Sequence, residues 1–306
     1  MMSGMYAAIS GLNAHQTMLD VTGNNLANVD TIGYKAQRTT FTDELSQLVR
    51  PGSAASAALG GTNPLQIGLG VEVGSIDNMM GTGSVQTTGN ATDVAIQGDG
   101  FLVVQAGQAS ASAPGNTPPA NGPQWTAADN GNAPIQYTRA GNLSLTPDAN
   151  GNTYLTTPSG QYVLGTFGPN APATSTTAPV SPIEIPAGAT NIAIASNGEV
   201  TYTWTDGTSQ TAGYIALATM ANEAGMQRDG NSLWSTTSNT GTTVTYGQPG
   251  TGNIGQTISG ELETSNVDMA TEFTNMIEAQ RGYQANAQTV TTADQMMQSV
   301  LQMKQG

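Results

Sequence analysis

Residues 265–304 decide the fold, and they read SNVDMATEFTNMIEAQRGYQANAQTVTTADQMMQSVLQMK. Alternating steps of four and three residues through this stretch select a seam that is mostly apolar or aromatic. The seam is Met269, Phe273, Met276, Gln280, Tyr283, Ala287, Val290, Asp294, Met297 and Leu301. Such spacing is typical of the a and d positions of a coiled coil. Ser265 and Asp268 have the spacing of a capping box, so we predict one long helix that begins near Ser265.

The same periodicity returns at the other end of the chain, in residues 2–28. Its apolar positions include Met5, Ile9, Leu12, Leu19 and Leu26. Glycines interrupt this second helix, and each costs about 1 kcal/mol relative to alanine, so the helix would be marginal alone. Two terminal helices with nothing similar between them most simply pair as a coiled coil. Two other arrangements stay open: a plain two-helix cap on a globular domain, and helices that wait for other copies of the chain.

Between the helices the pattern is that of β-structure. Short apolar runs from Val71 to about Ile258 alternate with turns such as Asn197-Gly198 and Asp206-Gly207. We therefore expect a mixed α and β fold, with an all-β domain of antiparallel strands inserted between the paired helices. The predicted domains are a discontinuous helical domain (1–30 with 265–306), an extended connector (31–74) and a β-rich outer domain (75–264).

Composition excludes several classes of partner. Only 9% of the 306 residues are charged, against roughly a quarter in an average globular protein. The net charge of −14 argues against binding to nucleic acid or to an anionic membrane. The sequence has no apolar run of the roughly 20 residues that a membrane span requires, and no secretory leader pattern at its start. If the protein leaves the cell, we expect it to do so without a cleaved leader.

The sequence offers little material for catalysis or metal binding. It contains no cysteine and a single histidine, His15, which lies beside the seam of the N-terminal helix. Asp148, Asn150 and Asn152 alternate as in a calcium loop, but Ser159 stands where a bidentate glutamate is needed. A hairpin turn is the better interpretation of that stretch. We expect no enzymatic activity, no cofactor and no metal site.

Several longer motifs resemble those of a known family. Residues 5–12 (MYAAISGL) and 19–35 (LDVTGNNLANVDTIGYK) resemble the N-terminal signature of the bacterial flagellar rod and hook proteins. Residues 262–297 are similar to the C-terminal signature of that family, while 93–101 (DVAIQGDGF) and 137–142 (YTRAGN) resemble its β-domain motifs. The matching positions of the first signature include Asn24, Asn25, Asn28, Thr31, Gly33 and Tyr34.

The resemblance implies a structural subunit whose terminal helices form an inner tube around an export channel, with the β domain outside. Within the family, residues 60–70 (GGTNPLQIGLG) and 267–274 (VDMATEFT) favour a compact hook subunit. Such subunits polymerise into a curved hollow tube that works as a universal joint between motor and filament. The alternative is a subunit of the straight distal rod, and a less favoured class is a surface β-domain adhesin with helical ends.

The implied location is the extracellular flagellum, in the hook and basal body, reached by the flagellar type III export route. The implied partners are other copies of the chain, the distal rod protein, the hook cap and hook–filament junction proteins, and the export apparatus. We expect the following residues to carry self-assembly: Met5, Ile9, Leu12, Leu19, Leu26, Met269, Phe273, Met276, Ile277, Tyr283, Val290, Met297 and Leu301. A polar, uncharged face of the last helix is expected to line the channel, through Gln284, Gln288, Gln295, Gln298 and Gln302.

Overall fold

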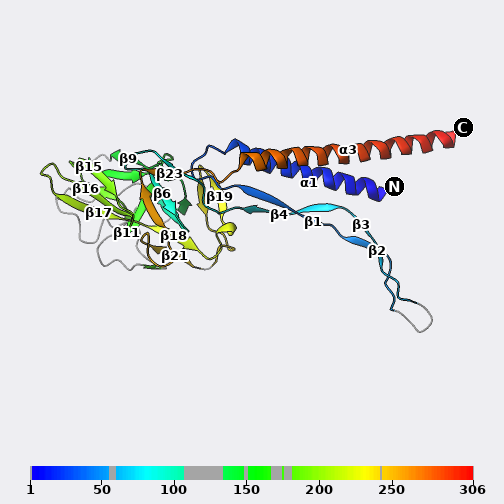
Figure 1. Cartoon of the computed structure of the whole chain (residues 1–306), viewed down its shortest axis with the longest axis horizontal. Coiled ribbons are helices and arrows are strands. Elements are labelled where there is room, and N and C mark those ends of the chain that lie inside the picture. The colour runs from blue at the N-terminus through cyan, green and yellow to red at the C-terminus, as the bar shows by residue number, and fades with distance from the viewer. Residues whose placement is uncertain are drawn as a thin grey trace. The chain divides into compact units, whose positions relative to one another are not determined.

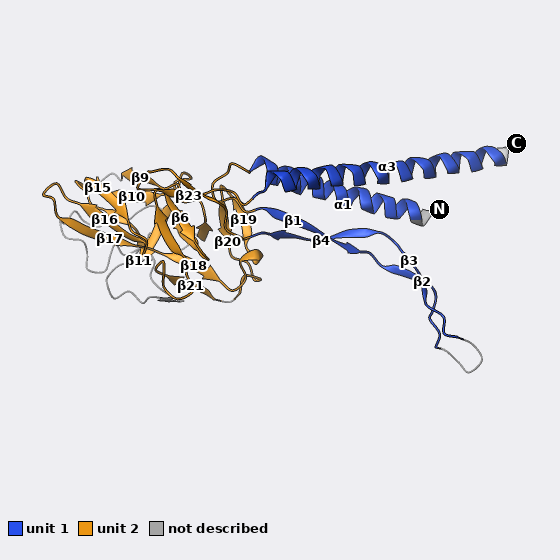
Figure 2. Ribbon diagram, viewed as in Figure 1, with its two compact units in different colours: residues 1–28, 36–79, 267–306 blue, residues 29–35, 80–266 orange. Residues whose placement is uncertain are grey.

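The computed structural model describes residues 2–54, 60–106, 134–147, 151–166, 174–175, 181–241 and 243–305. The chain divides into two compact units, which Figure 2 colours separately. Unit 1 consists of Met1–Asn28, Ala36–Met79 and Val267–Gly306, and unit 2 of Val29–Lys35 and Met80–Asn266. A helix at each end of the chain and a large antiparallel β domain between them confirm the predicted mixed fold class.

Two helices form the backbone of unit 1. Helix α1 (Met2–Ala27) and helix α3 (Met269–Gln305) lie side by side, with both chain ends at the same end of the pair (Figure 1). Helix α3 begins four positions later than the capping-box pattern predicted. The side chain of Asp268 accepts the backbone N–H of Ala270 at 3.0 Å and the hydroxyl of Thr271 at 2.9 Å, so Asp268 caps the helix instead of Ser265.

A long two-stranded arm completes unit 1. Strand β1 (Gln37–Asp43) pairs with β4 (Val71–Asn78), and β2 (Ser46–Arg50) pairs with β3 (Leu65–Gly68). Backbone hydrogen bonds from Glu44 to Gly70 and from Leu69 to Leu45 join the two pairs into one hairpin. The predicted connector, residues 31–74, is therefore extended but regular, because its backbone groups pair with one another.

Unit 2 is a sheet-rich unit in which every strand pair that the structure describes is antiparallel. The main path of its largest sheet runs β12-β21-β18-β7-β11-β17-β16-β15. Its strands are β5 (Val85–Thr87), β6 (Val94–Gln97), β7 (Phe101–Gln105), β8 (Ile135–Thr138), β9 (Ser144–Pro147), β10 (Thr153–Thr156), β11 (Tyr162–Thr166), β12 (Thr174–Ser175), β13 (Ser181–Pro182), β14 (Glu184–Ile185), β15 (Asn191–Ile194), β16 (Glu199–Thr203), β17 (Ser209–Ile215), β18 (Leu217–Met220), β19 (Gln227–Gly230), β20 (Leu233–Ser235), β21 (Val244–Gly247), β22 (Gln256–Ser259) and β23 (Glu261–Glu263).

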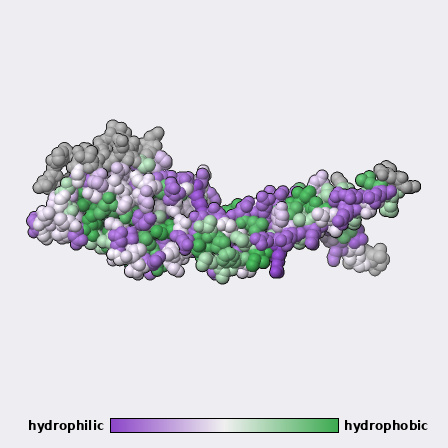
Figure 3. Space-filling view, turned by 90° about the horizontal axis from the view of Figure 1, so that it is seen from above, coloured by the Kyte–Doolittle hydropathy of each residue, from purple (hydrophilic) through white to green (hydrophobic). Residues whose placement is uncertain are grey.

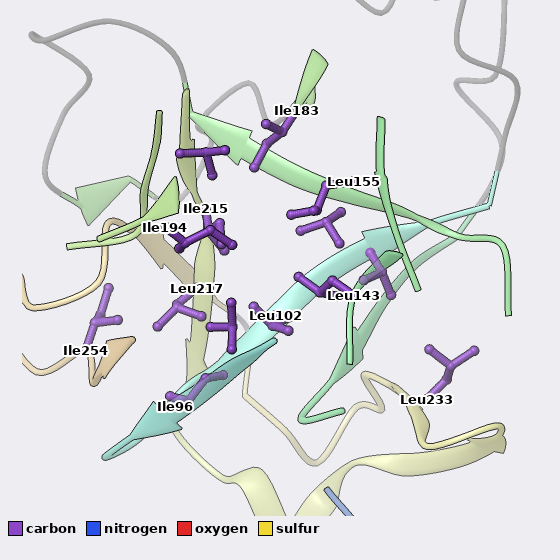
Figure 4. Close-up of a cluster of buried hydrophobic side chains, with 14 residues drawn as sticks. Ile96, Leu102, Leu143, Leu155, Ile183, Ile194, Ile215, Leu217, Leu233 and Ile254 are labelled. Carbon is purple, nitrogen blue, oxygen red and sulfur yellow. The ribbon is translucent and has the colours of Figure 1, made fainter. Parts of the chain in front are cut away.

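The apolar cores that the structure describes both lie in unit 2. Strand β7 separates them, because its side chains alternate between its two faces. Leu102 and Val104 belong to a cluster with Leu155, Ile215 and other aliphatic side chains, drawn in Figure 4. Phe101 and Val103, on the opposite face, pack with an aromatic cluster that includes Tyr137 and Trp234. Unit 2 therefore has the hydrophobic content to fold by itself.

The predicted domain boundaries differ from the observed units in several places, since residues 75–79 belong to unit 1 and residues 265–266 to unit 2. Residues 29–30, predicted to end the first helical segment, and residues 31–35, predicted to open the connector, belong to unit 2 together with the strand that precedes the last helix. The backbone N–H of Gly33 donates to the carbonyl of Glu263 at 2.9 Å, which fixes this segment against β23. The rest of the predicted connector, residues 36–74, belongs to unit 1.

Candidate self-assembly surface

The two terminal helices contact each other through small and polar side chains. Ala8, Ala14 and Ala279 are buried in unit 1. A Cβ added at Gly11 would lie 2.6 Å from Nδ2 of Asn286, and one added at Gly282 would lie 2.5 Å from the ring of His15. The missing side chains of the two glycines therefore let the helix backbones approach closely. His15 packs against Gly282, and its ring is tilted against that of Phe41, with 6.0 Å between the ring centroids.

Only part of the apolar seam predicted from the sequence is covered where α1 meets α3. Met269, Phe273, Ile277, Tyr283, Met297 and Leu301 are exposed, and so is Ile9 on α1. Met5, Leu12, Leu19, Leu26, Met276 and Val290 are partly buried. On α3 the face turned inward is shifted, and it carries Glu272 and Ala279. The exposed apolar side chains of α3 named above are called the outward stripe. Figure 3 shows hydrophobic patches between hydrophilic stretches on the surface.

The apolar stripe of α3 continues beyond the N-terminal end of α1. The contacts of Gly11 with Asn286, His15 with Gly282 and Asn25 with Glu272 define one antiparallel register. This register places the first residue of α1 opposite Gln295, so the last turns of α3 have no partner in α1. Those turns carry the exposed side chains Met296, Met297, Val300, Leu301 and Met303. Exposed apolar surface of this extent is typical of a surface that binds another protein.

The arm carries a second set of exposed apolar side chains. Both faces of β2 and β3 are exposed along their whole length. Their apolar residues and the adjoining Leu45 stand 51–80% exposed: Leu45, Leu48, Val49, Leu65 and Ile67. The base of the arm is held to α1 instead, since the hydroxyl of Ser10 accepts the backbone N–H of Val71 at 3.2 Å. The arm is thus fixed at its base and uncovered beyond it.

Asn25 joins three parts of unit 1 at one buried point. Its Nδ2 donates to the carbonyl of Gln37 at 2.7 Å and to Oε1 of Glu272 at 3.1 Å, and its Oδ1 accepts the N–H of Gln37 at 2.9 Å. The amide therefore pairs with the backbone of β1 as a neighbouring strand would, while it also holds α3. Burial raises the pKa of Glu272, because the charged carboxylate is disfavoured there.

The other predicted motif residues divide between the two units. In unit 1, Asn24 is exposed, and Nδ2 of Asn28 donates to the carbonyl of Asn24 at 2.9 Å. In unit 2, Gly33 and Tyr34 are buried, and Arg228 stacks over the Tyr34 ring at 4.5 Å. Thr31 lies in the same segment and is partly buried. The motif therefore combines helix-tethering residues with residues of the β unit.

The predicted channel-lining glutamines are all exposed: Gln284, Gln288, Gln295, Gln298 and Gln302. Nε2 of Gln298 donates to Asp294 at 2.9 Å. Asp148 and Asn150 of the calcium-like pattern lie outside the described residues. Within the described part of the chain, no group of His, Cys, Asp and Glu is arranged to hold a metal ion. No helix there has the length and apolar character to cross a membrane.

Comparison with family models places motifs of flagellar axial proteins along the chain. A model described as "Flagella basal body rod protein" matches residues 5–35. One for the "Flagellar hook protein FlgE/F/G D1 domain" matches residues 121–202, and one for the "Flagellar basal body rod FlgEFG protein C-terminal" matches residues 258–303. The first and last matches span α1 and α3 together with the adjoining segments of unit 2.

Whole-chain relatives are similar over nearly their full length. The flagellar basal-body rod protein FlgG of Bacillus subtilis is 39% identical, with 99% of this chain and 100% of the relative covered. FlgG of Agrobacterium fabrum is 34% identical, covering 96% of this chain and 97% of the relative. The flagellar hook protein FlgE of Borreliella burgdorferi is 28% identical, covering 99% of this chain and 100% of the relative, in an alignment of 442 residues.

Proposed function

Because the chain belongs to the family of bacterial flagellar rod and hook proteins, a structural component of the flagellum, we propose that it is a subunit of the rod. The observation that carries this choice is the match to rod proteins along their whole length. The hook relative extends over 442 aligned positions, against 306 residues in this chain, so it contains segments that this chain lacks. The motif at residues 60–70 had favoured a hook subunit, and the relatives favour the rod alternative.

Assembly through the outward apolar stripe is the mechanism that the geometry favours. Each Leu- or Phe-sized side chain that becomes buried between copies contributes about 1.5–3 kcal/mol. The stripe and the overhanging turns of α3 supply such side chains in a row, among them Phe273, Ile277 and Leu301. A second copy of the chain offers the same stripe, so a helical homopolymer covers it without any other partner.

Ordering of the terminal helices is coupled to assembly in this mechanism. The contact between α1 and α3 buries mostly alanine, glycine and polar side chains, which contribute little against backbone ordering at about 1–2 kcal/mol per residue. We expect the amides from Phe273 to Val300 to exchange rapidly with solvent in the unpolymerised protein and slowly in the polymer. Strong protection in the monomer would contradict this coupling.

Electron microscopy of the concentrated full-length protein tests the proposed function. Straight tubes are expected for a rod subunit, whereas curved tubes would support the hook alternative. Failure to polymerise under conditions in which unit 2 is folded would refute assembly by this chain alone. The Phe273→Gln variant is compared with the unchanged protein, because the substitution removes one side chain of the apolar stripe while leaving the buried contacts of α3 in place.

The exposed glutamine face is proposed to line the central channel. An uncharged, polar wall neither attracts nor repels unfolded subunits that pass along it during export. Replacing Gln288 and Gln295 by lysine is then expected to slow export of later subunits without preventing polymerisation. Export at the original rate, measured by accumulation of secreted subunits, would rule out this role for the glutamines.

A further inference from the structure

Within unit 2, Glu263 binds residues from three separate segments of the chain. Its Oε1 accepts Nζ of Lys35 at 2.7 Å and the backbone N–H of Gly83 at 2.9 Å. Its Oε2 lies 3.3 Å from Nη1 of Arg139, and its carbonyl accepts the N–H of Gly33. The side chains of Lys35, Arg139 and Glu263 are each about 1% exposed. A carboxylate buried this deeply needs such partners, because a lone charge would be strongly disfavoured.

The segment that follows α1 is held by shape as well as by charge. Gly33 has a φ of +66°, and a Cβ added there would lie 2.6 Å from the carbonyl carbon of Arg139. The guanidinium of Arg228 stacks between the rings of Tyr34 and Trp234, at 4.5 and 4.9 Å, and donates to the carbonyl of Lys35. Residues 33–35 are thus bound on several sides within unit 2.

The segment that precedes α3 is held at the same place. The N–H of Thr264 donates to the carbonyl of Ser84 at 2.8 Å, and Nδ2 of Asn266 donates to the carbonyl of Gly81 at 3.0 Å. The carbonyl of Gly81 also accepts Nζ of Lys35 at 2.9 Å. The N–H of Asn266 donates to the carbonyl of Tyr34 at 3.4 Å. The two segments that lead into the terminal helices therefore touch each other directly.

We propose that Glu263 is a positioning residue that holds the segments leading out of α1 and into α3 together before the helices pair. We name the residues Gly33, Lys35, Gly83, Arg139 and Glu263 the root clamp. Its partners all belong to unit 2, so the clamp persists when the helices are disordered. This role holds for a rod subunit and for a hook subunit alike, and it concerns the unpolymerised chain.

The expected effect follows from the length of flexible chain between the helices. With the clamp closed, the path from Gly11 to Asn286 runs only from Gly11 to Gly33 and from Glu263 to Asn286. With residues 29–35 released and the arm unpaired, the flexible path instead runs from Gly11 to Val85 in β5 and from Glu263 to Asn286. Lengthening the path from about 45 to about 97 residues lowers the effective concentration of one helix at the other about threefold, by the three-halves power of loop length.

A disulfide between the helices measures this concentration, because the natural chain has no cysteine. Gly11→Cys and Asn286→Cys place one thiol on each helix where α1 and α3 touch. The equilibrium of this disulfide with glutathione, in unpolymerised protein, gives the effective concentration. In this background Glu263→Gln and Lys35→Met are each expected to lower it about threefold.

The matched control is Glu261→Gln, on the same strand but outside the clamp, where the carboxylate accepts the Thr87 hydroxyl at 3.4 Å. Tryptophan fluorescence confirms that unit 2 remains folded in each variant. An unchanged effective concentration in folded Glu263→Gln and Lys35→Met would overturn the proposal. Loss of the native fluorescence in both variants would also overturn it, since the cluster would then serve only the stability of unit 2.

Discussion

Replacing Gly33 by alanine tests the fit of the segment that follows α1 into the β unit. A residue other than glycine at a left-handed φ such as the +66° of Gly33 costs about 1–2 kcal/mol. The added methyl group would also lie 2.6 Å from the carbonyl carbon of Arg139 and 2.7 Å from the N atom of Ala140. Neither atom can rotate away, because both belong to the backbone, and such overpacking costs about 1–3 kcal/mol more. The expected loss in the free energy of unfolding is about 2–5 kcal/mol.

Two control glycines in unit 2 separate these contributions. Gly207 has a φ of +86° and nothing within 4 Å of its added Cβ, so Gly207→Ala reports the strain without the clash. Gly81 has neither feature, so Gly81→Ala reports the general effect of alanine, including the reduced freedom of the unfolded chain. We expect Gly33→Ala to be less stable than Gly207→Ala by about 1–3 kcal/mol.

Urea unfolding followed by tryptophan fluorescence is the appropriate assay. The sequence has three tryptophans, at positions 125, 204 and 234, and none falls within the residue ranges of unit 1. The signal therefore reports unit 2 without interference from the terminal helices. If Gly33→Ala unfolds at the same urea concentration as Gly207→Ala, the close packing of residues 33–35 against Arg139 contributes nothing, and the reasoning fails.

Three further perturbations address unit 1 in the polymer, where its two helices are ordered and supply most of the helical circular dichroism of the described chain. Asn25→Ala leaves buried groups of Gln37 and Glu272 without the Asn25 amide and should lower helix stability by about 2–4 kcal/mol. Asn13→Ala, at an exposed position of the same helix, should leave helix stability unchanged. Equal melting curves for the two variants would refute this role of Asn25. Burial raises the pKa of Glu272, so the folded form binds its proton more readily than the unfolded form does. Helix stability should therefore fall as the pH rises from about 4.5 through that raised pKa, and Glu272→Gln should abolish the dependence; a pH profile unchanged by this substitution would refute the assignment. Ile277→Gln should raise the critical concentration for polymerisation at least about tenfold without changing the unfolding of unit 2, whereas Glu278→Gln should leave the critical concentration unchanged. Normal polymerisation of Ile277→Gln would remove Ile277 from the assembly surface.

The strands of unit 2 were the most predictable part of the fold. Apolar runs such as Phe101–Val104 and Val200–Tyr202 become strands because their side chains reach buried clusters on one or both faces. Strands β2 and β3 were missed as paired strands because both of their faces are exposed, so no alternation of apolar and polar residues marks them. Their pairing depends on backbone hydrogen bonds, which leave little trace in the sequence.

The start of the last helix shows how tertiary contacts override a local signal. Ser265 and Asp268 satisfy the spacing of a capping box, but residues 264–266 bond to the segments around Ser84 and Gly81. These contacts keep the backbone extended, and the helix can begin only after them. A local pattern cannot reveal this competition, because the partners lie about 180 residues away.

Periodicity identified both helices but only part of the face by which they meet. Large apolar residues mark the outward stripe, while the contact between α1 and α3 depends on Gly11, Gly282 and buried alanines, which carry almost no periodic signal. The root clamp was also missed, since Lys35 and Glu263 are 228 positions apart. One usable signal existed: in a chain with only seven Lys and Arg residues, Lys35 and Arg139 both fall inside the recognised motifs.

The crossing of Gly282 over His15 has a mechanical consequence. If α3 were displaced along α1 by one turn, Glu278 or Asn286 would arrive where Gly282 now sits, and its side chain would meet the imidazole ring. Such a displacement therefore requires the two helices to separate at this crossing. Under axial load, the close contact between Gly282 and His15 therefore resists sliding of α3 along α1, even where the two helices share little apolar surface.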